Sequence, residues 1–280
     1  MLTLTLGYSP CPNDTFLFYP LIHNSIPDTG FHFVERLEDV ETLNRLAMEE
    51  NLDICKVSYN AFAHIRERYI LLRSGGAMGR GCGPLIVSKR LNVPGDLKRK
   101  RIAVPGKFTT ACLLLQLFDP TLTELIFLPF DEIMTAVHEG QADAGVIIHE
   151  SRFTFQAYGL RKVLDLGEWW EKSTGLPLPL GGIAAKRSLG PSTLSRLSAL
   201  VRSSVEYARN HPEETLRYVH SHAQEMSKEV CSAHIALYVN DYSLDPGPDG
   251  EHAAEFLFER GEQLGLFPPS RTPLFVPAPR

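Results

Sequence analysis

The residues of this chain most suited to chemistry lie in segment 145–152, where the apolar run Val146–Ile148 leads into a histidine, a carboxylate, a hydroxyl and a guanidinium. The run predicts a strand buried on both faces. In open α/β sheets ligands bind beyond the carboxyl ends of the strands, which would place His149 beside a ligand. Histidine titrates near neutrality when unperturbed, so His149 is a candidate general base. The alternative is a strand-end histidine that only hydrogen-bonds a neighbouring loop.

A second candidate is the turn 106–110, Gly-Lys-Phe-Thr-Thr, between a predicted strand and a predicted helix. The exposed N–H groups at a helix start attract a carboxylate or a phosphate. Thr109 or Thr110 could contact such a ligand or could cap the helix, and the two roles are compatible.

Two further segments lie at the carboxyl ends of predicted strands. In the segment 55–58, Lys56 could pair with a substrate or be a solvated lysine. Cys55 is interpreted as a small buried residue rather than a nucleophile, because no histidine is tied to it by sequence. Asn13 and Asp14 follow the first predicted strand, where helix capping and contact with a ligand both remain open.

The composition is typical of a globular protein: 280 residues, 44% hydrophobic and 22% charged, with a net charge of −5. That balance provides no strong positive field for nucleic acid. The ten histidines form no H-E-x-x-H pattern, and there is no Walker A or G-x-S-x-G pattern, so we expect no metal and no nucleotide cofactor. Five scattered cysteines, no signal-peptide pattern and no membrane-length apolar run favour a cytoplasmic protein without a membrane partner. The oligomeric state is not predicted.

The elements that must position these residues alternate between strand and helix patterns, which predicts an α/β protein. The glycine-rich segment 73–83 predicts mobility or close backbone approach. The turn 93–96 opens a new unit, and a strand at 181–185 returns to the first. We predict a first lobe of residues 1–88 and 181–280 and an inserted lobe of residues 89–180. A two-stranded hinge would join them, with a ligand between the lobes.

Longer segments resemble the 1,4-dihydroxy-6-naphthoate synthase family of the futalosine route of menaquinone biosynthesis. They are S-P-C-P-N-D-T-F (9–16), L-E-D-V-E-T-L-N (37–44), R-S-G-G-A-M-G-R-G-C-G-P-L (73–85), G-V-I-I-H-E-S-R-F-T (145–154) and G-L-P-L-P-L-G (175–181). The similarity runs from the first predicted strand to about Tyr242 and into the C-terminal helix. Motifs of this length are more specific than a short pattern of glycines.

The resemblance implies a two-lobed fold like that of the type 2 periplasmic binding proteins, used here as a cytoplasmic enzyme. It implies a carbon–carbon lyase that converts a small anionic substrate, cyclic dehypoxanthinylfutalosine, to 1,4-dihydroxy-6-naphthoate without a metal or redox cofactor. By the same resemblance the base is His149, and the substrate-binding residues are Cys55, Lys56, Val57, Thr109 and Thr110. Further candidate contacts with the ligand are Asp14, Ser58 and Arg152, and Glu150 is a further candidate for proton transfer.

Two other functions fit the same fold. One is a binding protein for small anions without catalysis, which an intact ligand after incubation would indicate. The other is chorismate dehydratase, a lyase of the same pathway and fold. The histidine of I-I-H-E-S-R-F favours the naphthoate enzyme, and an assay on both substrates discriminates between them.

Overall fold

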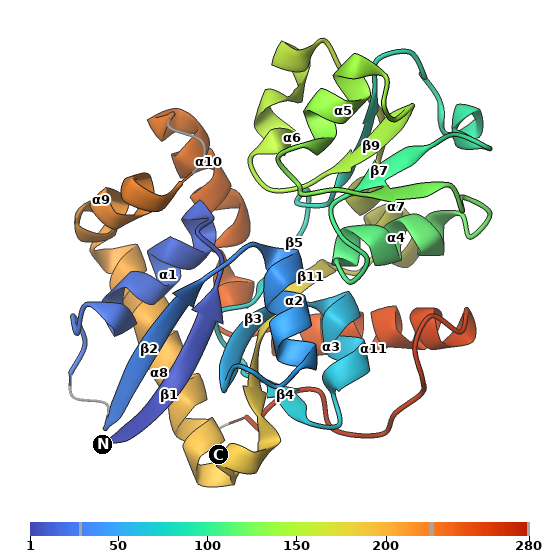
Figure 1. The fold of residues 1–280 in the computed structure, drawn as a ribbon. Helices are drawn as coiled ribbons and strands as arrows, with labels where there is room; N and C mark the ends of the chain where they lie inside the picture. Colours follow the sequence, from blue (N-terminus) through green and yellow to red (C-terminus); the bar gives the residue numbers. More distant parts are fainter. Residues whose placement is uncertain (28–29, 224–226, 279–280) are drawn as a thin grey trace. The chain divides into compact units, whose positions relative to one another are not determined.

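The chain folds into two compact units, each with its own sheet (Figure 1). The computed structural model describes residues 1–27, 30–223 and 227–278. Unit 1 comprises Met1–Gly79 and Pro179–Arg280, and unit 2 is Arg80–Leu178. Helices flank both sheets, so the predicted α/β class is confirmed.

Unit 1 contains a six-stranded sheet in the order β2-β1-β3-β11-β4, with β5 paired to β11. Its strands are β1 (Leu2–Tyr8), β2 (Phe31–Leu37), β3 (Ile54–Ser58), β4 (Tyr69–Leu71), β5 (Ala77–Gly79) and β11 (Leu178–Lys186). β1 runs parallel to β2 and β3, whereas β11 is antiparallel to β3 and β4. The carboxyl ends of β1 and β3 therefore meet at one side of the sheet. We call residues 9–14 and 56–58 the unit 1 carboxyl edge.

The alternating leucines of β1 explain why this strand divides two packing layers. Leu4 and Leu6 are buried in a core formed with α1 and α8. Gly7 faces the other side, where a Cβ atom would lie 3.0 Å from the Leu43 side chain of α2. The helices of unit 1 are α1 (Pro12–Ile22), α2 (Val40–Met48), α3 (Tyr59–Ile65), α8 (Pro191–Asn210), α9 (Pro212–His222), α10 (Lys228–Tyr238) and α11 (Gly247–Gln263), with 3₁₀ turns η3 (Arg187–Leu189) and η4 (Asp241–Ser243).

Unit 2 contains a five-stranded sheet in the order β10-β6-β9-β7-β8. Its strands are β6 (Leu85–Ser88), β7 (Ile102–Val104), β8 (Leu125–Phe127), β9 (Ala144–Ile147) and β10 (Arg161–Asp165). Its helices are α4 (Thr110–Phe118), α5 (Ile133–Glu139), α6 (Ser151–Thr154) and α7 (Leu166–Thr174), with 3₁₀ turns η1 (Pro94–Leu97) and η2 (Phe155–Tyr158). β7 is parallel to both β8 and β9, so their carboxyl ends share one side. We call residues 105–110, 128–130 and 148–152 the unit 2 carboxyl edge.

The boundary between the units differs from the prediction, which kept residues 80–88 in the first lobe. β6 hydrogen-bonds to β9 on one side and β10 on the other, so it belongs to the sheet of unit 2. The chain instead passes between the units after β5 and again within β11, and these two strands pair with each other. The second boundary, after Leu178, lies close to the predicted one.

The glycine-rich segment 73–83 shows the close backbone approach that its composition predicts. A Cβ atom on Gly83 would lie 2.3 Å from the Cα atom of Gly167, at the start of α7. In unit 1, Gly75 has a φ of +85° and donates its N–H to the carbonyl of Ser243 at 2.8 Å. Arg73 to Gly75 are buried, because they lie under η4 and α11.

Residues at the ends of other elements have the types that general rules of capping favour. Asp39 caps α2, accepting hydrogen bonds from the N–H groups of Glu41 and Thr42 at 2.9 and 3.2 Å. Gly140 ends α5 in the left-handed conformation expected of a residue after a helix. In the proline-rich tail, Val276 and Leu274 hydrogen-bond to Leu71 along the outer side of β4 at 2.9 Å.

Candidate active site

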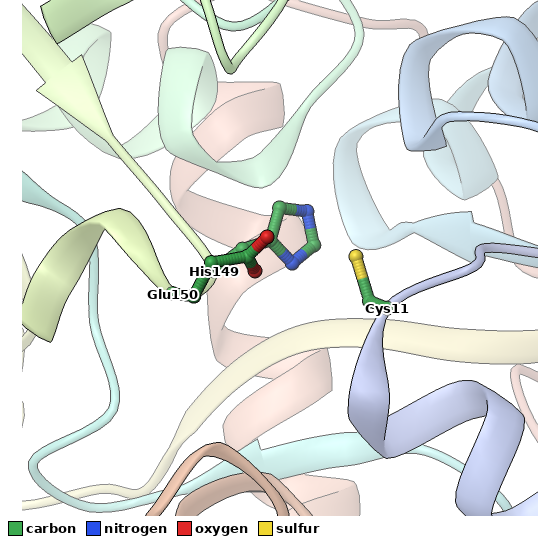
Figure 2. A group of neighbouring side chains, drawn as sticks. All are labelled: Cys11, His149 and Glu150. Atoms are coloured by element: carbon green, nitrogen blue, oxygen red, sulfur yellow. The ribbon is translucent and has the colours of Figure 1, made fainter. Parts of the chain in front are cut away.

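His149 lies on a turn immediately after β9 rather than on the strand itself. β9 ends at Ile147, and Figure 2 shows His149 on the loop that follows this strand. His149 has a φ of +56°, in the left-handed region. Histidine enters this region more often than most residues, but the conformation still costs on the order of 1 kcal/mol. Strained backbone of this kind tends to occur at functional sites. The predicted position after a strand is thus confirmed, while the strand, predicted to extend to Ile148, ends one residue earlier.

The imidazole of His149 packs against an aromatic ring that the sequence analysis missed. The Phe130 ring is 5.0 Å from the His149 ring, centroid to centroid, at an interplanar angle of 63°. Phe130 is buried and follows β8, so it reaches the unit 2 carboxyl edge by the same rule that places His149 there. An apolar wall on one side of the ring lowers the local dielectric and restricts the ring orientation.

The residues after His149 fasten this turn to the rest of unit 2. Arg152 donates to the carbonyl of Gly83 and, at 2.9 Å, to Oδ2 of Asp165. Oδ1 of Asp165 in turn accepts from the N–H groups of Gly167 and Glu168 and so caps α7. These bonds give Arg152 a structural role, because its guanidinium joins α6, the glycine-rich segment and α7; its contact with a ligand stays a prediction. Glu150, the other candidate for proton transfer, directly follows His149 in the sequence, and it is buried.

Thr109 caps α4, as one of the two predicted roles requires. Its Oγ1 accepts from the N–H of Cys112 at 3.2 Å and donates to the carbonyl of Gly106 at 2.9 Å. Thr110 is the first residue of α4, and both threonines are buried. Because β7 and β9 are adjacent and parallel, the Thr109–Thr110 helix start and the His149 turn follow neighbouring strands on the same side of one sheet.

At the unit 1 carboxyl edge, Lys56 is buried and paired, so the solvated lysine considered from the sequence is wrong. Its Nζ lies 2.8 Å from Oδ1 of Asp14 and 3.1 Å from the carbonyl oxygen of Gly75. Asp14 is not the cap of α1, because the N-cap residue of that helix is Cys11. Its carboxylate instead accepts from Ser9 Oγ at 2.8 Å and from Asn13 Nδ2 at 2.8 Å. The structure thus joins two predicted site residues that lie far apart in the sequence.

The other predicted residues of this edge are fully or nearly fully buried. Cys55 and Val57 have no exposed surface, and burial, followed by the nearby charge of Asp14, raises the pKa of the Cys55 thiol far above its ordinary range. Cys55 is therefore a small buried residue, as interpreted from the sequence, and the substrate contact that the resemblance implies for it stays a prediction. Ser58 starts α3 without a side-chain cap; its Oγ and N–H bind the Asn44 side chain at 3.2 and 2.9 Å.

A second missed feature extends this network into the C-terminal helices. The His234 ring of α10 is fully buried, and its Nε2 lies 2.9 Å from Oδ1 of Asn13. Asn13 thus links α10 to Asp14. The helical pattern around His234 contains no sequence motif that could have indicated this contact.

No helix in the described part of the chain is both long and apolar enough to cross a membrane. Solved structures of other α/β proteins share the fold of this chain. The alkanesulfonate-binding protein from Xanthomonas axonopodis pv. citri matches with a TM-score of 0.68 at 13% identity, covering 98% of this chain and 96% of that chain. This similarity shows the fold alone: the protein has the periplasmic-binding-protein-like fold that the sequence predicted.

Nearer relatives identify the family. A crystal structure of a protein from Archaeoglobus fulgidus matches with a TM-score of 0.89 at 35% identity, covering 95% of this chain and 98% of that chain. The family model described as menaquinone biosynthesis matches residues 4–263. The chain belongs to this family, as its motifs predicted.

Two curated relatives have the name "1,4-dihydroxy-6-naphtoate synthase". The relative from Thermus thermophilus is 51% identical over 276 residues, which is 99% of this chain and 100% of the relative. The relative from Streptomyces coelicolor is 45% identical over 271 residues, covering 95% of each chain.

Proposed function

We propose that this protein is a carbon–carbon lyase that forms 1,4-dihydroxy-6-naphthoate from cyclic dehypoxanthinylfutalosine. The nearly full-length similarity to two relatives named for that product supports the proposal. The structural observation that carries it is the left-handed turn at His149, which lies on the same side of the sheet as the Thr109–Thr110 helix start. A base beside an anion-binding helix start is what proton abstraction from an anionic substrate needs.

In the proposed mechanism, neutral His149 removes a proton from a carbon of the bound substrate. The resulting electron pair forms a carbon–carbon double bond and expels the leaving group, and the skeleton breaks to release a small sugar-derived fragment. Aromatisation of the naphthalene ring provides the driving force. These steps move protons and electron pairs within the substrate, so the proposal includes no redox cofactor and no metal.

Binding and orientation are assigned to the start of α4. The substrate carboxylate would be held by the helix dipole and by N–H groups at Thr109 and Thr110, which sets the reacting carbon toward the base. Phe130 would exclude water from one face of the imidazole and keep its orientation fixed. In this scheme Thr109 both caps α4 and shapes the anion site.

The decisive experiment is the His149→Asn variant, because asparagine tolerates the left-handed backbone but cannot act as a base. We expect kcat to fall by about 10²–10⁴-fold, the usual contribution of a general base, with the melting temperature nearly unchanged. The matched control is His138→Asn in α5, where the ring Nδ1 lies 2.8 Å from the Tyr158 carbonyl oxygen. Turnover retained in a folded His149→Asn protein would contradict the assignment of the base.

The two alternatives are tested in the same assay. The alkanesulfonate-binding protein has the same fold without a synthase name, which keeps a pure binding function as the second candidate. Incubating wild-type protein with cyclic dehypoxanthinylfutalosine and, separately, chorismate distinguishes all three functions by mass analysis of the products. The cytoplasmic location and the partners expected from the sequence stay predictions.

A further inference from the structure

The unit 1 carboxyl edge contains a buried ion pair that the proposed mechanism does not use. The side chains of Lys56 and Asp14 retain only 7% and 3% of their exposed surface. Removing both charges from water costs several kcal/mol per ion, and such pairs are often no more stabilising than apolar residues of similar size. A contribution to stability therefore does not explain why this pair is buried, and the geometry of the pair suggests a further role.

The hydrogen bonds show that Asp14 and Lys56 differ in what they can still bind. Asp14 accepts two hydrogen bonds at each oxygen: Oδ1 from Lys56 and Asn13, and Oδ2 from the Oγ and N–H of Ser9, the last at 3.3 Å. A carboxylate has about four acceptor positions, so these four bonds occupy it. Asp14 is thus not placed to bind a ligand or to accept a proton without losing a bond.

The ammonium group of Lys56 has three N–H donors, of which the structure uses two. Asp14 Oδ1 and the carbonyl oxygen of Gly75 accept them. Within residues 1–27, 30–223 and 227–278, no third acceptor lies within hydrogen-bonding distance of this nitrogen. One donor of a fixed cation is therefore available to a further oxygen atom.

The surrounding backbone is built to hold the lysine side chain in this position. A Cβ atom on Gly181, in β11, would lie 3.3 Å from Lys56 Cε and 3.1 Å from the carbonyl oxygen of Val57, so glycine leaves the space that the side chain occupies. Gly75 adopts a φ of +85°, which favours glycine, and its carbonyl reaches the ammonium. The pair lies after β1 and near the carboxyl end of β3, where open α/β sheets bind ligands.

We infer that Asp14 is a positioning residue: it fixes the Lys56 ammonium so that its third N–H binds a substrate oxygen other than the carboxylate assigned to the start of α4. The inference rests on the proposed function and adds a division of roles to it. Lys56 contacts the substrate, while Asp14 acts only through Lys56. Ser9 and Asn13 hold the carboxylate, and through Asn13 the orientation of the pair depends on His234 of α10.

The test compares Asp14→Asn, Lys56→Met and the double variant by steady-state kinetics on cyclic dehypoxanthinylfutalosine. Loss of one member of a buried charge pair predicts a KM about 10–100-fold higher in each single variant, with kcat within about threefold of wild type. Because Asp14 acts through Lys56, the double variant should have the KM of Lys56→Met within about twofold. Additive effects in the double variant would overturn the inference.

The matched control is Asp53→Asn, which breaks a second Asp–Lys pair at the opposite end of β3. Asp53 Oδ1 lies 3.1 Å from Lys186 Nζ and is remote from the carboxyl edge. A purely structural role predicts that Asp14→Asn and Asp53→Asn both lower the melting temperature and leave KM unchanged, and this result would also overturn the inference. If Asp14→Asn does not fold, Ser9→Ala is the substitute variant. It removes one hydrogen bond that holds the Asp14 carboxylate, keeps the charge, and should raise KM by a smaller factor.

Equilibrium binding of 1,4-dihydroxy-6-naphthoate, which has two hydroxyl oxygens besides its carboxylate, separates the inference from the proposed function. If wild-type protein does not form this compound but Asp14→Asn weakens its binding when it is added, the proposed function fails and the inference stands. If wild-type protein is active but neither KM nor the Kd of this compound changes in Asp14→Asn, the inference alone fails. Absence of both turnover and binding in wild-type protein contradicts both.

Discussion

The two carboxyl edges have the same topology but different chemistry. The unit 1 edge contains a buried cation and carboxylate whose positions are fixed by side-chain hydrogen bonds. The unit 2 edge contains a half-buried imidazole on a strained turn and a helix start capped by Thr109. Its own partly buried ion pair joins Arg152 to Asp165, the residue that caps α7. The proposed roles follow this difference: the unit 1 edge binds the substrate through a fixed cation, and the unit 2 edge removes a proton.

The comparison also shows that similar ion pairs differ in role. Asp14 and Asp165 each accept hydrogen bonds from a cation and from groups of their own unit. Asp165 uses backbone N–H groups of a helix start, so its pair secures secondary structure. Asp14 uses side chains and the N–H of Ser9 to orient a lysine at the strand ends. Burial of a pair therefore does not reveal its role; the partners do.

The largest expected effect on stability comes from substituting a glycine at a close approach in each unit. Gly83→Ala would place a Cβ atom 2.3 Å from Cα of Gly167, and because Cα is a backbone atom, the backbone at Gly83 or at the start of α7 has to move. We expect a loss of more than about 3 kcal/mol in the free energy of unfolding, measured by urea denaturation. In unit 1, Gly7→Ala meets the end of the Leu52 side chain at 2.5 Å and should cost about 1–2 kcal/mol.

The control for both glycine variants is Gly95→Ala. A Cβ atom at Gly95 has no neighbour within 4 Å, so its substitution should change the unfolding free energy by less than about 0.5 kcal/mol. A loss of unfolding free energy in Gly83→Ala no larger than that in Gly7→Ala would contradict this prediction. It would mean that the close approach of Gly83 and Gly167 constrains unit 2 no more than a side-chain contact constrains unit 1.

A smaller effect sharpens the contrast between the ion pairs. Arg152→Met leaves Asp165, only 8% exposed, without its cation, while Asp165 keeps its two bonds to the start of α7. We expect a loss of about 2–3 kcal/mol in unfolding free energy, somewhat less than for a fully buried pair, because Arg152 is partly exposed. The exposed pair of Lys172 and Glu168 provides the control: Lys172→Met should be indistinguishable from wild type. A stable Arg152→Met protein with impaired substrate binding would instead restore the ligand contact predicted from the sequence.

The smallest effect concerns the strained turn. His149→Ala and His149→Asn both remove the imidazole, but alanine tolerates a φ of +56° less well than asparagine. The alanine variant should therefore be about 1 kcal/mol less stable than the asparagine variant in thermal or urea unfolding. Equal stabilities would indicate that the turn relaxes and that its strain is not imposed by unit 2.

Much of this molecule was predictable because strand patterns and the carboxyl-edge rule are local. They placed β1, β3, β7, β9 and the polar residues that follow them. β6 was assigned to the wrong unit, because its place depends on which strands it pairs with. Its pairing with β9 and β10 cannot be deduced from its own sequence. The boundary between units was misplaced for the same reason.

The site residues divide along the same line. His149 and the threonine pair were identified from their positions after strands, and their roles in binding and catalysis remain predictions. Phe130 was missed because an apolar residue after a strand resembles any core residue, although it contacts the His149 ring. The pairing of Lys56 with Asp14 joins residues 42 positions apart, and only the folded backbone brings them together.

The tail segment that runs beside β4 has a consequence for handling the protein. Leu274 and Val276 hydrogen-bond to Leu71, and Arg187 reaches the carbonyl oxygen of Pro273, so the tail covers the outermost strand of the unit 1 sheet. An uncovered outer strand offers unpaired N–H and C=O groups to other chains and promotes aggregation. A shortened version of the protein, or a purification tag that draws this segment away, would expose such a strand, so tags are better attached elsewhere.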